Sequence, residues 1–150
     1  MIEIRKANEK DIPQIARLEK MCFSAPWSEK ALLETMESEE SLFLVAEKDK
    51  KTVGYIGSYF CHPEGYITNV AVDPEERRQG IGRRLIEELI LRGKELELEF
   101  WTLEVRESNV PAISLYDSLG FEKVGRRPRF YSNPEEAAEL MTYYIDASLK

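Results

Sequence analysis

Asn69-Val-Ala-Val-Asp-Pro-Glu-Glu-Arg-Arg-Gln-Gly-Ile-Gly-Arg-Arg-Leu85 is the stretch that decides how the rest of the chain is interpreted. It begins as a buried strand, turns at a proline, and passes through two glycines into a helix. The free N–H groups at such a helix start, and the positive end of the helix dipole, attract an anion. Gly80 and Gly82 let a phosphate approach the backbone where a Cβ would obstruct it. The stretch therefore predicts a pyrophosphate-bearing ligand, and further positive charge comes from Arg77, Arg78 and Arg83.

The spacing of the glycines distinguishes between designs of phosphate site. A P-loop needs Gly-x-x-x-x-Gly-Lys-Ser/Thr, which this stretch lacks, and a dinucleotide fingerprint needs a third glycine where the chain has Leu85. Arg/Gln-x-x-Gly-x-Gly/Ala after a Val-Asp-Pro strand end is a more specific pattern than Gly-x-Gly alone. An ordinary glycine-containing helix start with solvated arginines is the alternative.

Size and composition narrow the class of protein. The 150 residues suit one domain, residues 1–150, and an apolar content of 43% is ordinary for a globular protein. A net charge of −7 disfavours nucleic acid and favours a basic partner, such as a cationic peptide tail. We expect no signal peptide, no membrane span and a cytoplasmic location.

The cysteines and the histidine argue against several chemistries. Cys22 and Cys61 form no Cys-x-x-Cys motif, and His62 is the only histidine, so we expect no metal site and no histidine-based triad. Cys61 and His62 are neighbours, but Pro63-Glu64-Gly65 follows them, which favours a hairpin turn over a nucleophile pair.

Hydrophobic patterning predicts the order βαα-ββ-β-α-β-α-ββ, which is a mixed α/β (α+β) sheet with helices on both faces. Expected helix caps are Asn8 with Asp11, Ser28 and Asn109, and Gly120 ends the last helix. Leu98–Val105 is apolar on both faces, as in a central strand covered on both sides. The expected strands are Ile2–Lys6, Ser41–Glu47, Thr52–Phe60, Tyr66–Val72, Leu98–Val105 and two within Phe121–Ile145. Four helices are expected: one contains Ile12, the second contains Leu32 and Leu33, the third runs from Ile81 to Ile90, and the fourth from Ala112 to Leu119.

Two side chains are candidates for chemistry. Glu104 lies near the end of the strand Leu98–Val105, where ligands gather in sheets of this kind, and a partly desolvated carboxylate there suits a general base. The alternative is a structural carboxylate paired with an arginine, Arg106 being nearest in sequence. Tyr116 follows on the next helix, where it shares a face with apolar residues, so packing in the core is the alternative to catalysis.

Several segments carry a resemblance to a known family. The Asn69–Leu85 stretch resembles the acyl-CoA-binding motif of the Gcn5-related N-acetyltransferases (GNAT). Leu103-Glu-Val-Arg-Glu-Ser-Asn-Val-Pro-Ala-Ile-Ser-Leu-Tyr-Asp-Ser-Leu-Gly-Phe121 resembles the segment typical of RimI-type N-terminal acetyltransferases. Pro26-Trp-Ser-Glu-Lys30 is similar to the N-terminal loop of that group, and Arg129-Phe-Tyr131 to its late substrate-side loop. Phe130 is a departure, because relatives often carry two tyrosines there.

The resemblance implies a fold and roles for individual residues. The fold is a mostly antiparallel sheet with a central parallel strand pair. Glu104 is implied as the proton acceptor for the attacking amine and Tyr116 as the proton donor to the departing thiolate. The co-substrate is acetyl-CoA, and no metal is implied. Its pantetheine arm is implied to contact Val70, Ala71 and Val72, and its reactive end is implied to contact Asn109. Its pyrophosphate is implied to be held by Arg78, Gln79, Gly80, Ile81, Gly82 and Arg83.

The resemblance also implies the acceptor, which is the N-terminal alanine of small-subunit ribosomal protein eighteen. Phe23, Trp27 and Tyr131 are candidates to line a slot for the acceptor's first residues, with simple packing of loops onto the sheet as the alternative. Two rival functions remain open: acetylation of a small amine or an internal lysine on the same fold, and a non-catalytic acyl-CoA-binding module. The sequence does not indicate an oligomeric state.

Overall fold

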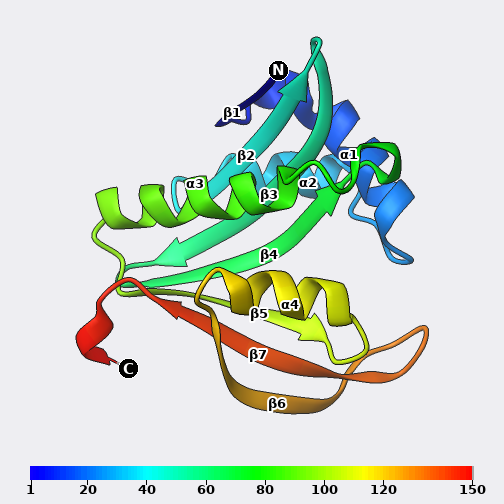
Figure 1. The fold of residues 1–150 in the computed structure, drawn as a ribbon. Coiled ribbons are helices and arrows are strands. Elements are labelled where there is room, and N and C mark those ends of the chain that lie inside the picture. The colour runs from blue at the N-terminus through cyan, green and yellow to red at the C-terminus, as the bar shows by residue number, and fades with distance from the viewer. Residues whose placement is uncertain (150) are drawn as a thin grey trace.

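The computed structural model describes residues 1–149, which form a seven-stranded sheet with helices on both faces (Figure 1). The strand order is β1-β2-β3-β4-β5-β7-β6. Every neighbouring pair is antiparallel except β4 and β5, which are parallel. The strands are β1 (Ile2–Lys6), β2 (Ser41–Lys48), β3 (Lys51–Cys61), β4 (Glu64–Val72), β5 (Phe100–Arg106), β6 (Glu122–Tyr131) and β7 (Glu136–Tyr144).

The helices follow the order expected from the sequence. They are α1 (Ile12–Cys22), α2 (Glu29–Met36), α3 (Ile81–Glu95) and α4 (Val110–Ser118), with short 3-10 turns at η1 (Glu9–Asp11), η2 (Pro74–Glu76) and η3 (Ala147–Leu149). The expected caps are confirmed. Asn8 and Asp11 form a capping box at η1, directly before α1, and Ser28 caps α2. Asn109 caps α4, and Gly120 takes a positive φ of 102° just after it. The Cys61–Glu64 hairpin is also confirmed.

Two apolar clusters hold the helices to opposite faces of the sheet. In Figure 1, α3 and α4 lie in front of the sheet, and α1 lies behind it. The front cluster joins α3 and α4 to the sheet through Leu85, Leu103 and Tyr116, among others. The rear cluster joins α1 and α2 to β2, β3 and β4 through Ile15, Leu32 and Tyr55, among others. Met21, near the end of α1, is exposed.

The expectation that β5 is covered on both faces is wrong. Trp101, Leu103 and Val105 are buried under α3 and α4, but the residues that alternate with them are only half-buried. The reason is that α1 and α2 pack on β2, β3 and β4 and do not extend over β5. One face of β5, which carries Glu104, is therefore open to ligands.

Within residues 1–149, no helix is both long enough and apolar enough to cross a membrane.

Candidate active site

The parallel strands β4 and β5 stay paired for only a short distance. Glu64–Tyr66 pairs with Phe100–Thr102, and beyond this point the two strands diverge (Figure 1). A register shift opposite Gly57 and Ser58 leaves Thr68 as an extra residue in β4. The carboxyl-terminal half of β4 thus has β3 on one edge and no paired strand on the other.

The divergence frees part of the β4 backbone. Asp73 N–H donates to Val53 O on β3 at 2.8 Å, and in an antiparallel ladder alternate residues turn their N–H and C=O groups the same way. Ala71 therefore faces Tyr55 on β3, while Val70 and Val72 direct main-chain groups towards the gap. An extended ligand arm in the gap would meet the hydrogen-bonding edge of a strand there.

The predicted phosphate loop starts α3 as the sequence indicates. Gly80 is the residue before the helix, with a φ of 75° and no side-chain capping bond. Arg84 N–H donates to Gly80 O at 3.0 Å and is the first intrahelical donor, so the N–H groups of Ile81, Gly82 and Arg83 have no acceptor within the helix. A Cβ added at Gly80 would meet no atom within 4 Å, which means that the space beside it is open to a ligand. These features suit an anion.

The polar side chains of this loop have different surroundings. Arg78 is exposed and has a φ of 67°, a strained conformation for a residue with a side chain. Arg83 donates to Ser118 Oγ at 2.6 Å, which joins the start of α3 to the end of α4. Gln79 Nε2 donates to Glu76 Oε2 at 2.8 Å, so its side chain braces the loop.

Glu104 lies on the half-open face of β5, at the edge of the gap. Its nearest ion-pair partner is Arg127 of β6, whose Nε is 3.8 Å from Glu104 Oε1. The Arg127 side chain is exposed and that of Glu104 is 34% exposed, so solvent screens this pair. The sequence suggested Arg106 as the partner, but that guanidinium is held by Glu136 at 3.2 Å and by the carbonyl groups of Ser132 and Pro134. Glu104 is thus accessible to an incoming amine.

Tyr116 lies on α4, in the front core, as the packing alternative predicts. It is 8% exposed, and its ring centroid is 5.5 Å from that of Phe121. Burial, and then the nearby Tyr131, raise the pKa of Tyr116 to about 12. Within residues 1–149 its hydroxyl makes no hydrogen bond. A buried ring with an uncommitted hydroxyl is compatible with proton donation as well as with packing.

Tyr131, at the end of β6, connects the two candidates. Burial raises the pKa of Tyr131 to about 12, and the Glu104 charge contributes in the same direction, while Tyr131 in turn acts on Tyr116. Arg106 stacks on the Tyr131 ring, with its Cζ 4.5 Å from the centroid. Tyr131 therefore lies within electrostatic reach of both Glu104 and Tyr116.

The other predicted residues make local contacts of their own. Phe23 and Trp27 are half-buried and pack against the rear cluster. This agrees with the packing alternative, and it is also compatible with a contact to the acceptor. Asn109 Oδ1 accepts from Ala112 N–H at 3.3 Å, so its oxygen serves as the helix cap. No group of three or more His, Cys, Asp or Glu side chains in the described part of the chain is arranged to hold a metal ion.

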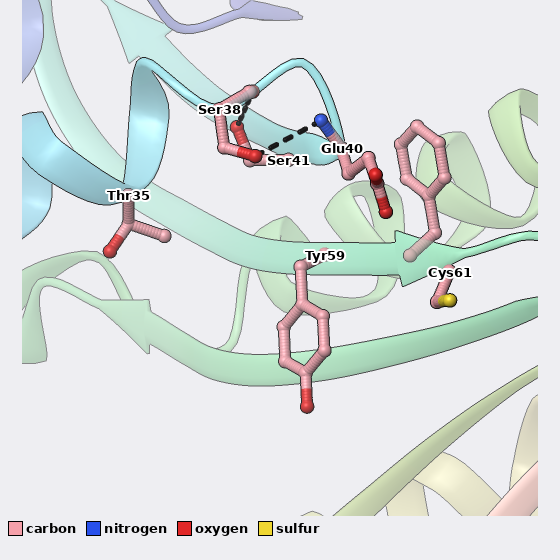
Figure 2. A pocket seen from close by; sticks show the side chains of 7 residues that line it. Thr35, Ser38, Glu40, Ser41, Tyr59 and Cys61 are labelled. Carbon is pink, nitrogen blue, oxygen red and sulfur yellow. Dashed lines mark hydrogen bonds between the residues drawn. The ribbon is translucent and has the colours of Figure 1, made fainter.

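One groove lies away from these residues. Figure 2 shows it between the end of α2, the start of β2 and the end of β3. It has a volume of about 470 Å³, and Ser38 Oγ accepts from Glu40 N–H at 3.2 Å in its wall. None of the predicted site residues is in its lining, which is Thr35, Ser38, Glu40, Ser41, Tyr59, Phe60 and Cys61.

Two polar networks were missed by the sequence reasoning. Arg106 and Glu136 fasten the β6–β7 turn, and Glu136 Oε2 also accepts from Ser108 N–H at 2.6 Å. Glu19 is fully buried with Tyr55 and Asn69. A signal existed for Glu19, because it lies four residues after Ile15, on the apolar face of α1.

Comparison with known proteins assigns the class. The sequence profile of the Acetyltransferase (GNAT) family matches residues 12–121, so the chain belongs to this family. The seven-stranded, mostly antiparallel sheet with its one parallel pair is the GNAT fold, and the protein is an acetyltransferase.

Individual relatives share most of the chain. The [ribosomal protein bS18]-alanine N-acetyltransferase of Salmonella typhimurium (strain LT2) is 37% identical over 143 residues, and 93% of each chain is covered. The enzyme of that name from Escherichia coli (strain K12) is 34% identical over 139 residues, again with 93% of each chain covered. The crystal structure of the Escherichia coli ribosomal-protein-S18-alanine N-acetyltransferase superposes with a TM-score of 0.90 at 33% identity, covering 97% of this chain and 94% of that one.

Proposed function

We propose that the protein is an acetyl-CoA-dependent Nα-acetyltransferase that acts on the N-terminal residue of a protein, by direct transfer within a ternary complex. The observation that carries the proposal is that a half-exposed carboxylate, Glu104, follows the point where β4 and β5 diverge, with an uncommitted hydroxyl, Tyr116, on the next helix and Tyr131 within electrostatic reach of both. The relatives named for N-terminal alanine acetylation support the choice of acceptor.

The residues present suit the co-substrate. The Ile81, Gly82 and Arg83 amides, with the open space at Gly80, would hold its pyrophosphate, aided by Arg78. The edge of β4 at Val70 and Val72 would hold its pantetheine arm, and Asn109 remains a candidate contact for its reactive end. When bound, acetyl-CoA supplies a thioester that an amine can attack.

Glu104 and Tyr116 have opposite tasks in this transfer. Glu104, directly or through water, accepts the proton that the amine must lose before it can attack. A tyrosine is protonated at neutral pH, and the rise in the pKa of Tyr116 to about 12 extends that state to higher pH, so its hydroxyl can donate to the leaving sulfur. An N–H group on the free edge of β4 is the candidate donor to the developing oxyanion.

The chemistry favours an α-amine over a lysine as the acceptor. Their ordinary pKa values are about 7.7–8.0 and about 10.4, so deprotonating the lysine at neutral pH costs roughly 3.4 kcal/mol more. A carboxylate base is better matched to the smaller cost. The net charge of −7 suits a basic acceptor tail, such as that of a ribosomal protein, which we expect the enzyme to meet in the cytoplasm.

The test is a comparison of acceptors by mass spectrometry with labelled acetyl-CoA. One peptide carries a free N-terminal alanine and a basic tail, a second is blocked at the N-terminus and contains one lysine, and a polyamine is the third substrate. We expect label only on the first α-amine. Label on the lysine or the polyamine alone would replace the proposal by one of the rival enzymes, and acetyl label retained on the protein would contradict direct transfer.

A further inference from the structure

Glu19 is a buried carboxylate that the transfer reaction does not use. It is 0% exposed on the apolar face of α1. Among residues 1–149, no lysine, arginine or histidine is within ion-pair distance of it. Burying a carboxylate without a cation is costly unless hydrogen bonds replace the lost water. The partners that compensate this burial therefore indicate what the residue does.

Three donors from three segments converge on Glu19. Trp27 N–H donates to Oε1 at 2.9 Å, and Asn69 Nδ2 donates to Oε2 at 3.0 Å. The Tyr55 hydroxyl also donates to Oε2. Burial and the adjacent Glu19 charge hold the pKa of Tyr55 above its ordinary range, which keeps this hydroxyl a donor. Both carboxylate oxygens are thus satisfied by neutral groups.

The donors belong to opposite sides of the proposed site. Trp27 lies in the segment between α1 and α2, which the sequence makes a candidate for contact with the acceptor. Asn69 follows the extra residue Thr68 in β4 and directly precedes Val70, whose backbone faces the gap. Tyr55, on β3, is fixed by stacking on Phe43, with ring centroids 6.2 Å apart. One carboxylate therefore spans the acceptor side and the thioester side.

We propose that Glu19 is a positioning residue for acetyl transfer, because its carboxylate holds the Trp27 segment and the Asn69 bulge in fixed relation to each other. The inference rests on the proposed function and adds a residue that touches neither substrate. An apolar side chain would fill the same space without the cost of burying a charge, so packing alone does not account for a carboxylate here. The main-chain N–H of Trp27 is the contact through which Glu19 orders the acceptor side.

Two substitutions separate positioning from packing. Glu19→Leu fills the space but removes both acceptor oxygens, whereas Glu19→Gln keeps one oxygen for the Trp27 amide, and its amide group can be accommodated if Tyr55 and Asn69 reorient. Glu34→Gln makes the same chemical change on the exposed face of α2 and is the matched control.

We expect Glu19→Leu to raise the KM for the acceptor peptide by roughly tenfold or more, with Glu19→Gln recovering most of the loss. The Kd for CoA should rise less than the peptide KM, because Glu19 contacts none of the residues from 78 to 83 and reaches the pantetheine side only through Asn69. Glu34→Gln should behave as the parent enzyme. A folded Glu19→Leu variant whose peptide KM lies within twofold of the parent would overturn the inference, as would equal losses in the Leu and Gln variants.

Hydrogen exchange keeps the inference testable if Glu19→Leu does not fold. We expect the Trp27 amide to exchange slowly in the parent, and to remain slow in Glu19→Gln. If the Trp27 amide of the parent exchanges as fast as an unprotected amide, Glu19 does not hold this segment and the inference is overturned. A parent enzyme that acetylates no N-terminal amine overturns the proposed function, whereas an active parent whose Glu19→Leu variant keeps its peptide KM overturns only the role of Glu19.

Discussion

Tyr116→Phe separates catalysis from stability at one position. The ring of Tyr116 is 8% exposed and packs against Phe121, while its hydroxyl makes no hydrogen bond within residues 1–149. Phenylalanine keeps the ring and removes only the group that we assign to proton donation. We therefore expect turnover to fall while the fold is unaffected.

The magnitudes follow from the surroundings of the hydroxyl. A positioned general acid contributes about 10²–10⁴-fold, so kcat should fall by at least about 100-fold, or roughly 2.7 kcal/mol in the barrier. The free energy of unfolding should change by less than about 0.5 kcal/mol, because no hydrogen bond is lost. Tyr55→Phe is the matched contrast. It removes the donor to buried Glu19 and should cost about 1–3 kcal/mol of stability.

The assay measures thiol release at saturating concentrations of acetyl-CoA and peptide, with urea unfolding of the same samples. Because the pKa of Tyr116 is raised to about 12, the hydroxyl stays protonated as the pH rises, and the parent kcat should show no alkaline loss from this group up to about pH 10. A Tyr116→Phe variant with kcat within threefold of the parent would refute the assignment. A Tyr116→Phe variant that loses as much free energy of unfolding as Tyr55→Phe would show that the Tyr116 hydroxyl makes a stabilising hydrogen bond.

Three further changes test other parts of the structure. Gly80→Ala places a side chain at a φ of 75° and should lower the free energy of unfolding in urea by about 1–2 kcal/mol. Gly82→Ala should leave this free energy unchanged, because its Cβ would make ordinary contacts at 3.6 and 3.8 Å. Equal losses in the two variants would contradict this. Burial opposes ionisation of Asp11, but two 2.8 Å hydrogen bonds from Arg5 prevail and lower its pKa. Its stabilisation is therefore complete above the ordinary aspartate pKa of about 3.9 and is lost as the pH falls towards the folded pKa, so Asp11→Asn should flatten the decline of Tm in acid. Arg106→Lys cannot hold two carbonyl groups and stack at once, so we expect a peptide KM raised several-fold at unchanged affinity for CoA; an unchanged KM would show that the β6–β7 turn does not need this clamp.

Local signals in the sequence predicted the parts of the site that are built from neighbouring residues. The start of α3 was identifiable because Gly80 and the strand ending at Val72 lie within one short stretch, and the physics of a helix start depends on adjacent residues only. The caps Ser28 and Asn109 were identifiable for the same reason.

Contacts between distant segments were not predictable in this way. Glu104 and Arg106 are two residues apart, yet Arg106 turns to the β6–β7 turn, and Arg127 approaches Glu104 instead. That outcome depends on irregular β6–β7 pairing, which shifts register between Arg127 and Tyr131. Glu19 meets its partners across 36 and 50 residues, and only the fold brings them together. Likewise, whether one face of β5 is covered depends on which strands α1 and α2 pack against. The sequence of β5 alone does not predict this.

Calorimetric titration of acetyl-CoA into the folded protein tests most directly whether the start of α3 and the free edge of β4 form a nucleotide site. We predict saturable binding of one acetyl-CoA per chain, weakened by added inorganic pyrophosphate that competes for the amides after Gly80. The absence of saturable binding to a protein that unfolds cooperatively would contradict the account.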